Sequence, residues 1–193
     1  RLCRDWSSDV CSSDLWTDLE ARFSWLRAMD SVPQSPVYHA EGNVLIHTRL
    51  VTEAMLSLEE WRGQAVADQQ ALYAAAMLHD VGKPACTITE EDGRITSRGH
   101  AKKGEKMARR LLWLGEELPA PAPGALREQI ARLVRFHGLP LQFLDKPDPV
   151  RAVIEASQHA CLDQVALLAE AAPPGGINLQ AVRKSLRARA TTT

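Results

Sequence analysis

The chain has no excess of charge of either sign and contains few aromatic residues. Its 193 residues include 23 Lys and Arg against 24 Asp and Glu, and aromatic side chains make up 5% of the total. This balance excludes a global polycation for bulk nucleic-acid binding, so any contact with nucleic acid is expected to be local. Hydrophobic residues make up 45% of the chain. With so few aromatics, this is typical of a helical domain rich in Leu and Ala.

Cysteine pairs at metal-binding or redox spacing are also missing. The four cysteines, Cys3, Cys11, Cys86 and Cys161, form no CxxC motif and stand in no secretory context. We therefore expect reduced thiols in a cytoplasmic protein. The sequence contains no apolar run as long as a membrane span or a signal sequence, so we expect a soluble protein with no membrane partner.

The most informative stretch runs from Leu72 to Pro84, LYAAAMLHDVGKP. An apolar helix without charge is predicted to end at His79 and Asp80, because Gly82 and Pro84 follow. A buried charge costs free energy unless it is paired or bound to a metal, so this His-Asp pair requires a partner. The alternative is a His favoured by the helix dipole beside an Asp that begins a turn.

A second histidine precedes this stretch on a helix of its own. Asn43 is predicted to cap a helix that continues to about Leu58, which places His47 in its first full turn. The positive end of the helix dipole disfavours protonation, so we expect a neutral imidazole suited to a metal. The alternative is a half-buried, hydrogen-bonded His. His39 and Glu41, on the preceding loop, are expected to orient the site rather than to ligate metal.

The two ends of the chain differ from its centre. Residues 1–15 are rich in Ser and Asp with a near-repeat, and we expect a non-native or disordered segment. From residue 16 to residue 30 the spacing predicts one amphipathic helix. Its apolar face is predicted to consist of Leu19, Phe23, Leu26 and Met29. A single long helix is expected at residues 149–172, followed by a divergent tail at residues 173–193 that is disordered or a short helix.

The segment between the central helix and the long helix is predicted to contain a hairpin and two helices. Residues 86–96 have two short runs with β-branched residues around a DG turn, which favours a small hairpin. A basic helix begins at His100, whose Lys and Arg residues form either a solvated face or the surroundings of a phosphate that His100 meets. Its predicted buried residues are Met107, Leu111 and Leu114. The next helix ends at His137, which is either a partner of the helix dipole or a site residue.

Four segments, taken in order, resemble the HD domain family: HxEGxVxxHT, MLHDVGKP, DGRITSRGHAKKGEKMARRLL and VRFHGLP. The likeness covers about residues 31–172. It is nearest to HD modules fused to P-loop polynucleotide kinases, and looser to the HD domains of tRNA CCA-adding nucleotidyltransferases. The resemblance implies an all-α fold, an HD-domain helical bundle with one small β-hairpin insertion. We expect this HD domain to span residues 16–172.

The resemblance also implies a bound divalent metal. The implied ligands are His47, His79, Asp80 and a distal Asp on the last core helix. Imidazole and carboxylate ligands suit Mn, Fe, Co, Ni or Zn, with Mg possible. In the related modules the distal Asp follows a run like LLAEA, whereas Ala172 follows that run here. Asp163 is predicted to lie on the opposite helix face, so we expect it not to replace the missing ligand.

The implied activity is hydrolysis of a phosphate monoester or diester. Asp80, Lys83 and His100 are the expected catalytic residues, and Lys83, His100, His137 and Arg135 are the expected substrate-binding residues. His100 and His137 can also surround the ligands or complete a second metal position. The kinase-fused relatives imply a nucleotide or RNA end with a 2′-phosphate or a 2′,3′-cyclic phosphate as substrate.

Two other functions remain open from the sequence. One is a non-catalytic HD module that binds RNA or nucleotide, and the other is a helical scaffold with coincidental histidines. The sequence has no P-loop motif GxxxxGK[ST] and no nucleotidyltransferase signature. Any kinase activity would therefore belong to a missing C-terminal P-loop kinase domain, and CCA addition is not assigned to this chain. We accordingly expect a fragment of a larger kinase-fused or nucleotidyltransferase protein.

Overall fold

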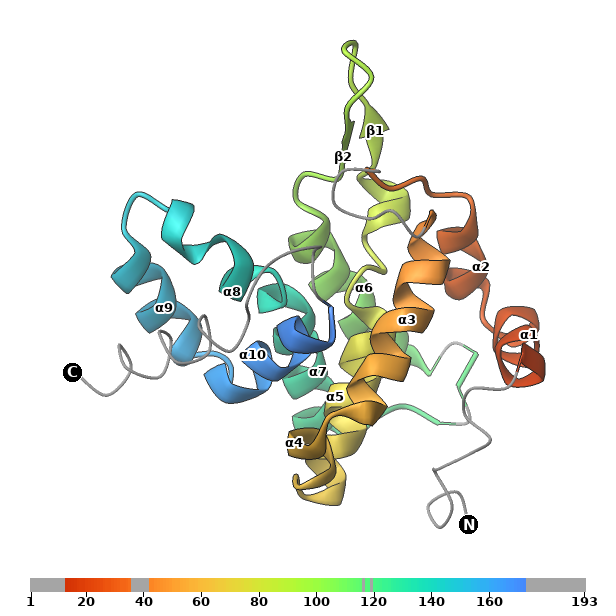
Figure 1. Ribbon diagram of the computed structural model, residues 1–193. Coiled ribbons are helices and arrows are strands. Elements are labelled where there is room, and N and C mark those ends of the chain that lie inside the picture. The colour runs from red at the N-terminus through yellow and green to blue at the C-terminus, as the bar shows by residue number, and fades with distance from the viewer. Residues whose placement is uncertain (1–12, 36–41, 116, 119, 173–193) are drawn as a thin grey trace.

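The computed structural model describes residues 13–35, 42–115, 117, 118 and 120–172, which form a helical bundle with one small hairpin (Figure 1). The expected all-α fold with a hairpin insertion is confirmed. The α-helices are α1 (Ser13–Arg22), α2 (Ser24–Asp30), α3 (Val44–Ser57), α4 (Glu59–Arg62), α5 (Val66–Leu78), α6 (His100–Leu114), α7 (Gly124–Phe136), α8 (Leu139–Gln142), α9 (Pro149–Ser157) and α10 (Leu162–Ala171). The 3₁₀ helices are η1 (Lys83–Ala85) and η2 (Phe143–Asp145), and the strands are β1 (Ile88–Thr89) and β2 (Ile95–Thr96).

Helix α5 occupies the centre of the bundle. It packs against α3, α7 and α10, and α7 in turn packs against α6. Ala71, Leu72, Ala75 and Ala76 on α5 have no solvent exposure. A helix surrounded in this way has no polar face to solvate, which explains why its second half carries no charge.

The predicted cap of α3 is confirmed. The side-chain oxygen of Asn43 accepts a hydrogen bond of 2.9 Å from the backbone nitrogen of Ile46, and its amide nitrogen donates to Asp30 at 2.9 Å. Asn43 therefore ties the start of α3 to the end of α2. His47 follows in the first turns of α3 and is 5% exposed.

The prediction of one helix over residues 16–30 is wrong, because the helix is interrupted at Phe23. Phe23 has an extended backbone (φ −107°, ψ 109°), so α1 ends at Arg22 and α2 begins at Ser24. The guanidinium of Arg27 donates to the carbonyl oxygens of Glu20 and Ala21, each at 2.7 Å. These bonds satisfy two carbonyls that an unbroken helix would have paired internally. The break also buries the Phe23 ring.

The prediction of one long helix over residues 149–172 is also wrong. The chain turns between Ser157 and Leu162, which separates α9 from α10. Val153 on α9 packs in a small second apolar cluster, whereas Val165 on α10 belongs to the main core. A straight helix could not bury both sets of side chains, so burial in two places explains the turn.

The buried face of α6 differs from the predicted one. Gly104, Ala108 and Leu112 are buried, whereas Leu114 is 50% exposed, and Met107 and Leu111 are partly buried. A Cβ added at Gly104 would lie 3.2 Å from the Val134 side chain on α7. Small residues thus let α6 approach α7 closely, which rotates the larger apolar side chains toward the edge of the contact.

The predicted hairpin is present and projects from the bundle (Figure 1). Ile88 pairs with Thr96 and Thr89 pairs with Ile95, and the turn contains Gly93 with φ +81°. This positive φ explains why glycine stands at the turn. Among the described residues, no helix is long and apolar enough to cross a membrane. His39, Glu41, residues 1–12 and residues 173–193 lie outside the described residues, so the predictions for them are untested.

Candidate metal centre

The structure brings together the three residues predicted as metal ligands. His79 follows the last residue of α5, and Asp80 begins the turn that leads to η1. Both are 1% exposed. The His47 ring on α3 lies with its centroid 5.3 Å from that of His79. The contact between α3 and α5 therefore places side chains 32 residues apart in the sequence at one buried point.

His100 and His137 join the same cluster. His100 is the first residue of α6 and His137 directly follows α7. The His137 ring centroid lies 5.3 Å from that of His79 and 5.2 Å from that of His100. Four predicted site histidines from four helices thus surround Asp80.

Backbone carbonyls fix the orientation of three of these rings. The Nδ1 atoms of His79, His100 and His137 lie 2.7, 2.7 and 2.8 Å from the carbonyl oxygens of Ala76, Ser97 and Val134. A carbonyl oxygen can only accept a hydrogen bond, so each Nδ1 carries the proton. Each Nε2 of a neutral ring is consequently left with its lone pair.

These lone pairs point at the same carboxylate. Nε2 of His79 lies 3.2 Å from Oδ2 of Asp80, and Nε2 of His100 and His137 lie 3.4 and 3.9 Å from Oδ1. Nε2 of His100 and Nε2 of His137 face each other at 3.3 Å. Nε2 of His79 and Oδ1 of Asp80 are buried without a hydrogen-bond partner. Lone pairs on neighbouring nitrogen and oxygen atoms repel one another unless a proton or a cation lies between them. These Nε2 and carboxylate oxygen atoms therefore suit a bound metal ion.

Two overlapping groups of ligands can each hold an ion. The first consists of His47, His79 and Asp80, and the second of Asp80, His100 and His137. The donor atoms within each group lie within 4.8 Å of one another. Asp80 belongs to both groups, and a carboxylate can bridge two ions through its two oxygens.

The electrostatics of the cluster keep the carboxylate charged and two imidazoles neutral. Burial raises the pKa of Asp80, but His79 and Lys83 lower it more, and the balance holds this pKa well below its ordinary value. Burial, reinforced by His79, lowers the pKa of His137 to about 3. Burial also lowers the pKa of His100. Neutral imidazoles beside an ionised carboxylate are the protonation states that metal binding requires.

Lys83 is held by two buried partners, one of which the sequence did not suggest. Its ammonium lies 2.8 Å from Oδ2 of Asp80 and donates a 2.5 Å hydrogen bond to the side-chain oxygen of Gln34. Gln34 is 6% exposed, and its amide nitrogen donates to the backbone carbonyl of Asn43 at 3.3 Å. The partners lie 49 residues apart, so no local pattern could have identified Gln34.

A tight backbone contact joins the HD turn to α6. A Cβ at Gly82 would overlap the carbonyl oxygen of His100 and would lie 2.7 Å from the backbone nitrogen of Gly104. The φ of Gly82 is −82°, so close approach rather than backbone conformation requires glycine here. This contact sets the distance between Asp80 and His100.

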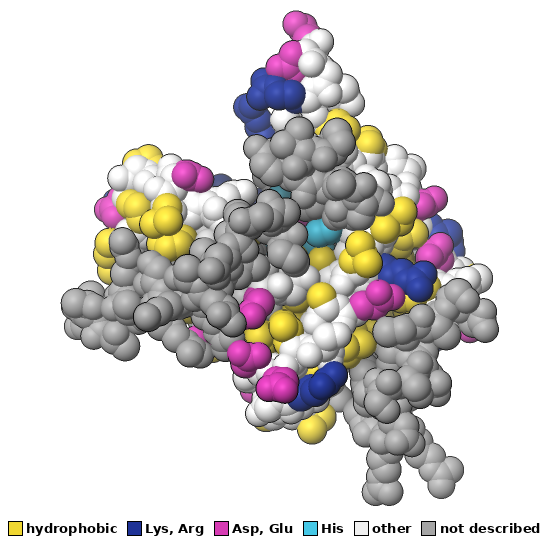
Figure 2. Space-filling model, in the orientation of Figure 1, with side chains coloured by type: hydrophobic (Ala, Val, Ile, Leu, Met, Phe, Trp, Pro, Cys, Tyr) yellow, Lys and Arg dark blue, Asp and Glu magenta, His cyan; other side chains and the backbone are white. Residues whose placement is uncertain are grey.

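The cluster opens into a cleft of about 1040 Å³. Figure 2 shows a histidine side chain that reaches the surface on the face where α3 lies. Ile95 of the hairpin and Ser97 line one part of the cleft, and Phe136 and Leu139 line another part. The cationic side chains along it are Lys83, Arg98, Arg135 and Lys146.

Arg135 was predicted to bind the substrate, and Ala172 stands where the related modules have a distal Asp ligand. Arg135 lines the cleft, although its Nε also lies 3.7 Å from a carboxylate oxygen of Glu105. Ala172 lines the same cleft as His47, His79 and Asp80, because α10 packs against α3 and α5. Asp163 lies in the first turn of α10 and is exposed, so it does not line this cleft.

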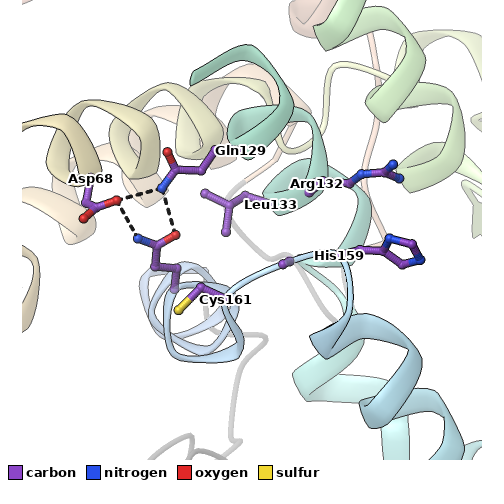
Figure 3. A pocket seen from close by; sticks show the side chains of 8 residues that line it. Asp68, Gln129, Arg132, Leu133, His159 and Cys161 are labelled. Carbon is purple, nitrogen blue, oxygen red and sulfur yellow. Dashed lines mark hydrogen bonds between the residues drawn. The ribbon is translucent and has the colours of Figure 1, made fainter. Parts of the chain in front are cut away.

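A second, smaller cavity of about 320 Å³ lies between α5, α7 and α10, away from the histidine cluster (Figure 3). Asp68 accepts hydrogen bonds from the side-chain amides of Gln129 at 2.7 Å and Gln164 at 2.9 Å, and Gln129 donates to Gln164 at 3.1 Å. These three side chains satisfy one another and join the three helices. Their role is to fix α10, and with it Ala172, against the helices that carry His79 and His137.

Comparisons with known proteins agree with this geometry. A family model described as "HD domain" matches residues 44–157. The chain is 33% identical over 110 residues to the "Multifunctional CCA protein" of Halorhodospira halophila (strain DSM 244 / SL1), a match covering 57% of this chain and 23% of that protein. It is 33% identical over 93 residues to the protein of the same name from Pasteurella multocida (strain Pm70), covering 48% of this chain and 21% of that protein. No solved structure gives a significant match.

The matched family segment is more than half of the chain, although the aligned region is less than a quarter of either relative. It contains His47, His79, Asp80, His100 and His137, the five residues of the histidine-aspartate cluster. An HD domain implies a metal-dependent, phosphohydrolase-type function. The family model and the buried histidine-aspartate cluster lead to one conclusion: the chain belongs to the HD domain family.

Proposed function

We propose that this HD domain hydrolyses a terminal phosphate of a nucleotide or RNA, either a 2′-phosphate or a 2′,3′-cyclic phosphate, in the cytoplasm. The observation that carries the proposal is the convergence of the Nε2 atoms of His79, His100 and His137 on the buried carboxylate of Asp80. His47, His79 and Asp80 would hold a divalent ion, for which Mn, Fe, Co, Ni and Zn are the best candidates and Mg is a further one. His100 and His137 would complete a second position with Asp80.

A divalent ion at this place would supply a water of lowered pKa and would polarise the phosphoryl group. The protein's own residues then bind and orient the substrate. An ammonium has three N–H donors. Two of the donors of Lys83 are directed to Asp80 and Gln34. The third remains for a phosphoryl oxygen at the wall of the cleft, and it would stabilise negative charge that develops there.

Arg135 would contact the substrate farther from the HD turn, because it lines the cleft and supplies several donors in a planar arrangement that suits a phosphate. His137 lines the same cleft, but its N–H donates to the carbonyl of Val134, so its Nε2 would act as a ligand or accept a hydrogen bond from a substrate hydroxyl. A neutral His100 presents a lone pair at Nε2, so it acts best as a ligand or as the acceptor of a proton from water. This role replaces the simpler picture of a cationic His100 that faces a phosphate.

An RNA end is favoured by the two relatives, because both carry the name multifunctional CCA protein. The chain aligns with less than a quarter of each relative, so their whole activity is not transferred to it. A C-terminal P-loop kinase domain is the partner that best suits a 2′-phosphate substrate, since removal of that phosphate would prepare an RNA end for repair.

A non-catalytic module that binds RNA or nucleotide is the second candidate. Ala172 favours it, because this position lines the same cleft as Asp80 and supplies no ligand. With one carboxylate in the two ligand groups, a divalent ion would stay incompletely neutralised. A chain with the same cleft but little bound metal would then bind phosphate ends without hydrolysing them.

The test combines metal analysis with phosphatase assays on 2′-AMP, 3′-AMP and 2′,3′-cyclic AMP. We expect metal-dependent release of phosphate from 2′-AMP, or opening of the cyclic phosphate, and loss of both metal and activity in His79→Ala. The exposed His159 provides the matched control, and His159→Ala should behave as the wild type. A fully metal-loaded chain that hydrolyses none of the three nucleotides would refute the hydrolase and favour the binding module.

A further inference from the structure

Helices α6 and α7 concentrate positive charge in a chain whose total charge is close to zero. Helix α6 carries five Lys and Arg against Glu105, and α7 carries three Arg against Glu128. The whole chain has a net charge of −1. These two helices pack against each other, so their positive charge forms one local field rather than two separate ones.

The outward face of α6 combines this charge with an aromatic ring. Residues spaced by four, three and four positions recur on one face of a helix. The residues with this spacing, which we call the basic stripe, are Lys102, Lys106, Arg109 and Trp113. Both lysines are exposed, and Trp113 is 58% exposed. The buried residues of α6 lie on the opposite side.

Two carboxylates hold in place Arg109 of the stripe and the arginines of α7 beside it. Glu105 accepts hydrogen bonds from Arg109 at 3.0 Å and Arg132 at 2.8 Å, and Nε of Arg135 lies 3.7 Å away. Glu128 accepts from Arg109 at 3.0 Å and Arg127 at 3.4 Å. Two carboxylates therefore order four guanidinium groups and leave a surplus of positive charge. Ordered guanidiniums lose less entropy when they bind a phosphate.

The lysines of the stripe have no such neutralising partner. Within the part of the chain that the structure describes, no carboxylate lies at ion-pair distance from Lys102 or Lys106. Unpaired lysines on a rigid helix provide point charges that can replace the counterions of a nucleic-acid backbone.

The stripe is continuous with the cleft at one end and ends in a stacking surface at the other. Arg135 lines the cleft and approaches the same Glu105 that binds Arg109. At the far end, the guanidinium of Arg127 lies 4.2 Å from the centre of the Trp113 ring. From residue 102 to residue 113 an α-helix rises about 16 Å. At about 3.4 Å per stacked nucleotide, this length spans four or five phosphates.

We propose that the basic stripe binds the backbone of a single RNA strand whose end enters the cleft, with one base stacked on Trp113. The inference rests on the proposed function for the placement of the RNA end. An exposed indole beside ordered guanidiniums suits a nucleobase better than an acidic peptide, because every base offers a face for stacking. A lipid surface is flat and could not follow the basic stripe into the cleft.

The test measures binding of a labelled single-stranded RNA oligonucleotide by fluorescence anisotropy across a salt series. The double variant Lys102→Ala/Lys106→Ala should reduce the slope of log affinity against log salt by about 1.4, since each phosphate contact on a single strand contributes about 0.7. Affinity at low salt should fall on the order of tenfold. The matched control Arg62→Ala/Arg151→Ala removes the same charge from exposed positions on α4 and α9 and should bind as the wild type.

The contribution of Trp113 to RNA affinity should not depend on the salt concentration, and this distinguishes it from the contribution of the lysines. Trp113→Ala should weaken RNA binding by about tenfold with an unchanged salt slope, and Trp113→Phe should retain most of the affinity, because stacking rather than charge is lost. Equal RNA affinities in the wild type and the lysine variant would overturn the inference. Binding to anionic lipid vesicles with no binding to RNA would overturn it as well.

Hydrolysis of 2′-AMP by the wild-type protein separates this inference from the proposed function. Stripe-dependent RNA binding without hydrolysis of any nucleotide would refute the proposed function and support the stripe. If the protein hydrolyses 2′-AMP and the stripe variants bind RNA as tightly as the wild type, the inference about the stripe is refuted and the proposed function is supported.

Discussion

A carboxylate restored at position 172 should increase metal binding. Ala172 lines the cleft that contains the histidine cluster, so Ala172→Asp would add a second negative charge to the cleft that contains Asp80. The existing charge is nearly cancelled, because the ammonium of Lys83 lies 2.8 Å from Oδ2 of Asp80. Without the substitution, a divalent ion would enter a site with almost no net charge. We therefore expect low metal occupancy in the chain as it stands.

The size of the effect follows from Coulomb's law at a partly buried site. Two unit charges 4 Å apart interact by about 4 kcal/mol at an effective dielectric constant near 20, and a divalent ion doubles this value. Repulsion from Asp80 and desolvation of the new carboxylate offset more than half of the gain. A net gain of about 2–4 kcal/mol remains, which corresponds to roughly 30-fold to 1,000-fold tighter binding.

Titration of the metal-free protein with Mn²⁺ or Zn²⁺ in a calorimeter measures this change, and the rate of 2′-AMP hydrolysis should rise with occupancy. Asp163→Asn is the control, because Asp163 is exposed on the first turn of the same helix and does not line the cleft. The reasoning fails if the wild-type chain already binds a full equivalent of metal and Asp163→Asn abolishes that binding.

Three further predictions concern the support of the cluster. Gln34→Leu should lower the free energy of unfolding by about 1.5–3 kcal/mol in urea denaturation, because the buried ammonium of Lys83 loses an acceptor; Gln158→Leu at an exposed position should change it by less than about 0.5 kcal/mol. Gly82→Ala should cost about 1–3 kcal/mol and weaken metal binding, because the added methyl group forces α6 away from the HD turn; an unchanged metal affinity would argue against this contact. The metal-free protein should lose stability as the pH falls below about 6.5, because burial lowers the pKa of His137 to about 3 and only the unfolded state takes up that proton. The slope should approach 1.4 kcal/mol per pH unit between about pH 6 and pH 4, and a flat profile of urea midpoints would contradict it.

Local signals in the sequence were sufficient for several elements. Asn43 caps α3 as predicted, since its side chain reaches a backbone group only three residues away. The DG turn at Gly93 has the positive φ that favours glycine. Helix α5 ends directly before His79 as expected, because residues that stop a helix follow it. Each of these features depends on neighbours in the sequence, where periodicity and capping rules apply.

Features that depend on distant contacts were not predicted. The apolar spacing continues through Phe23, although burial of its ring and the bonds from Arg27 break the helix there. The buried face of α6 follows the small residues Gly104 and Ala108, which matter only because α7 lies against them. Gln34 reaches Lys83 across 49 residues of sequence. Tertiary packing decides all of these, and a single sequence does not contain that information in readable form.

The bonds that orient His79, His100 and His137 share one geometry: each ring donates to the backbone carbonyl three residues before it. The orienting group is part of the main chain, so no substitution of another side chain can remove it. Mutations elsewhere can therefore change the distances between the rings without changing which nitrogen faces inward. A lineage could lose or gain a ligand, as at position 172, and keep the remaining imidazoles correctly aimed. The metal-binding capacity of such a centre would change in steps of one ligand, while the remaining imidazoles kept the orientation that metal binding requires.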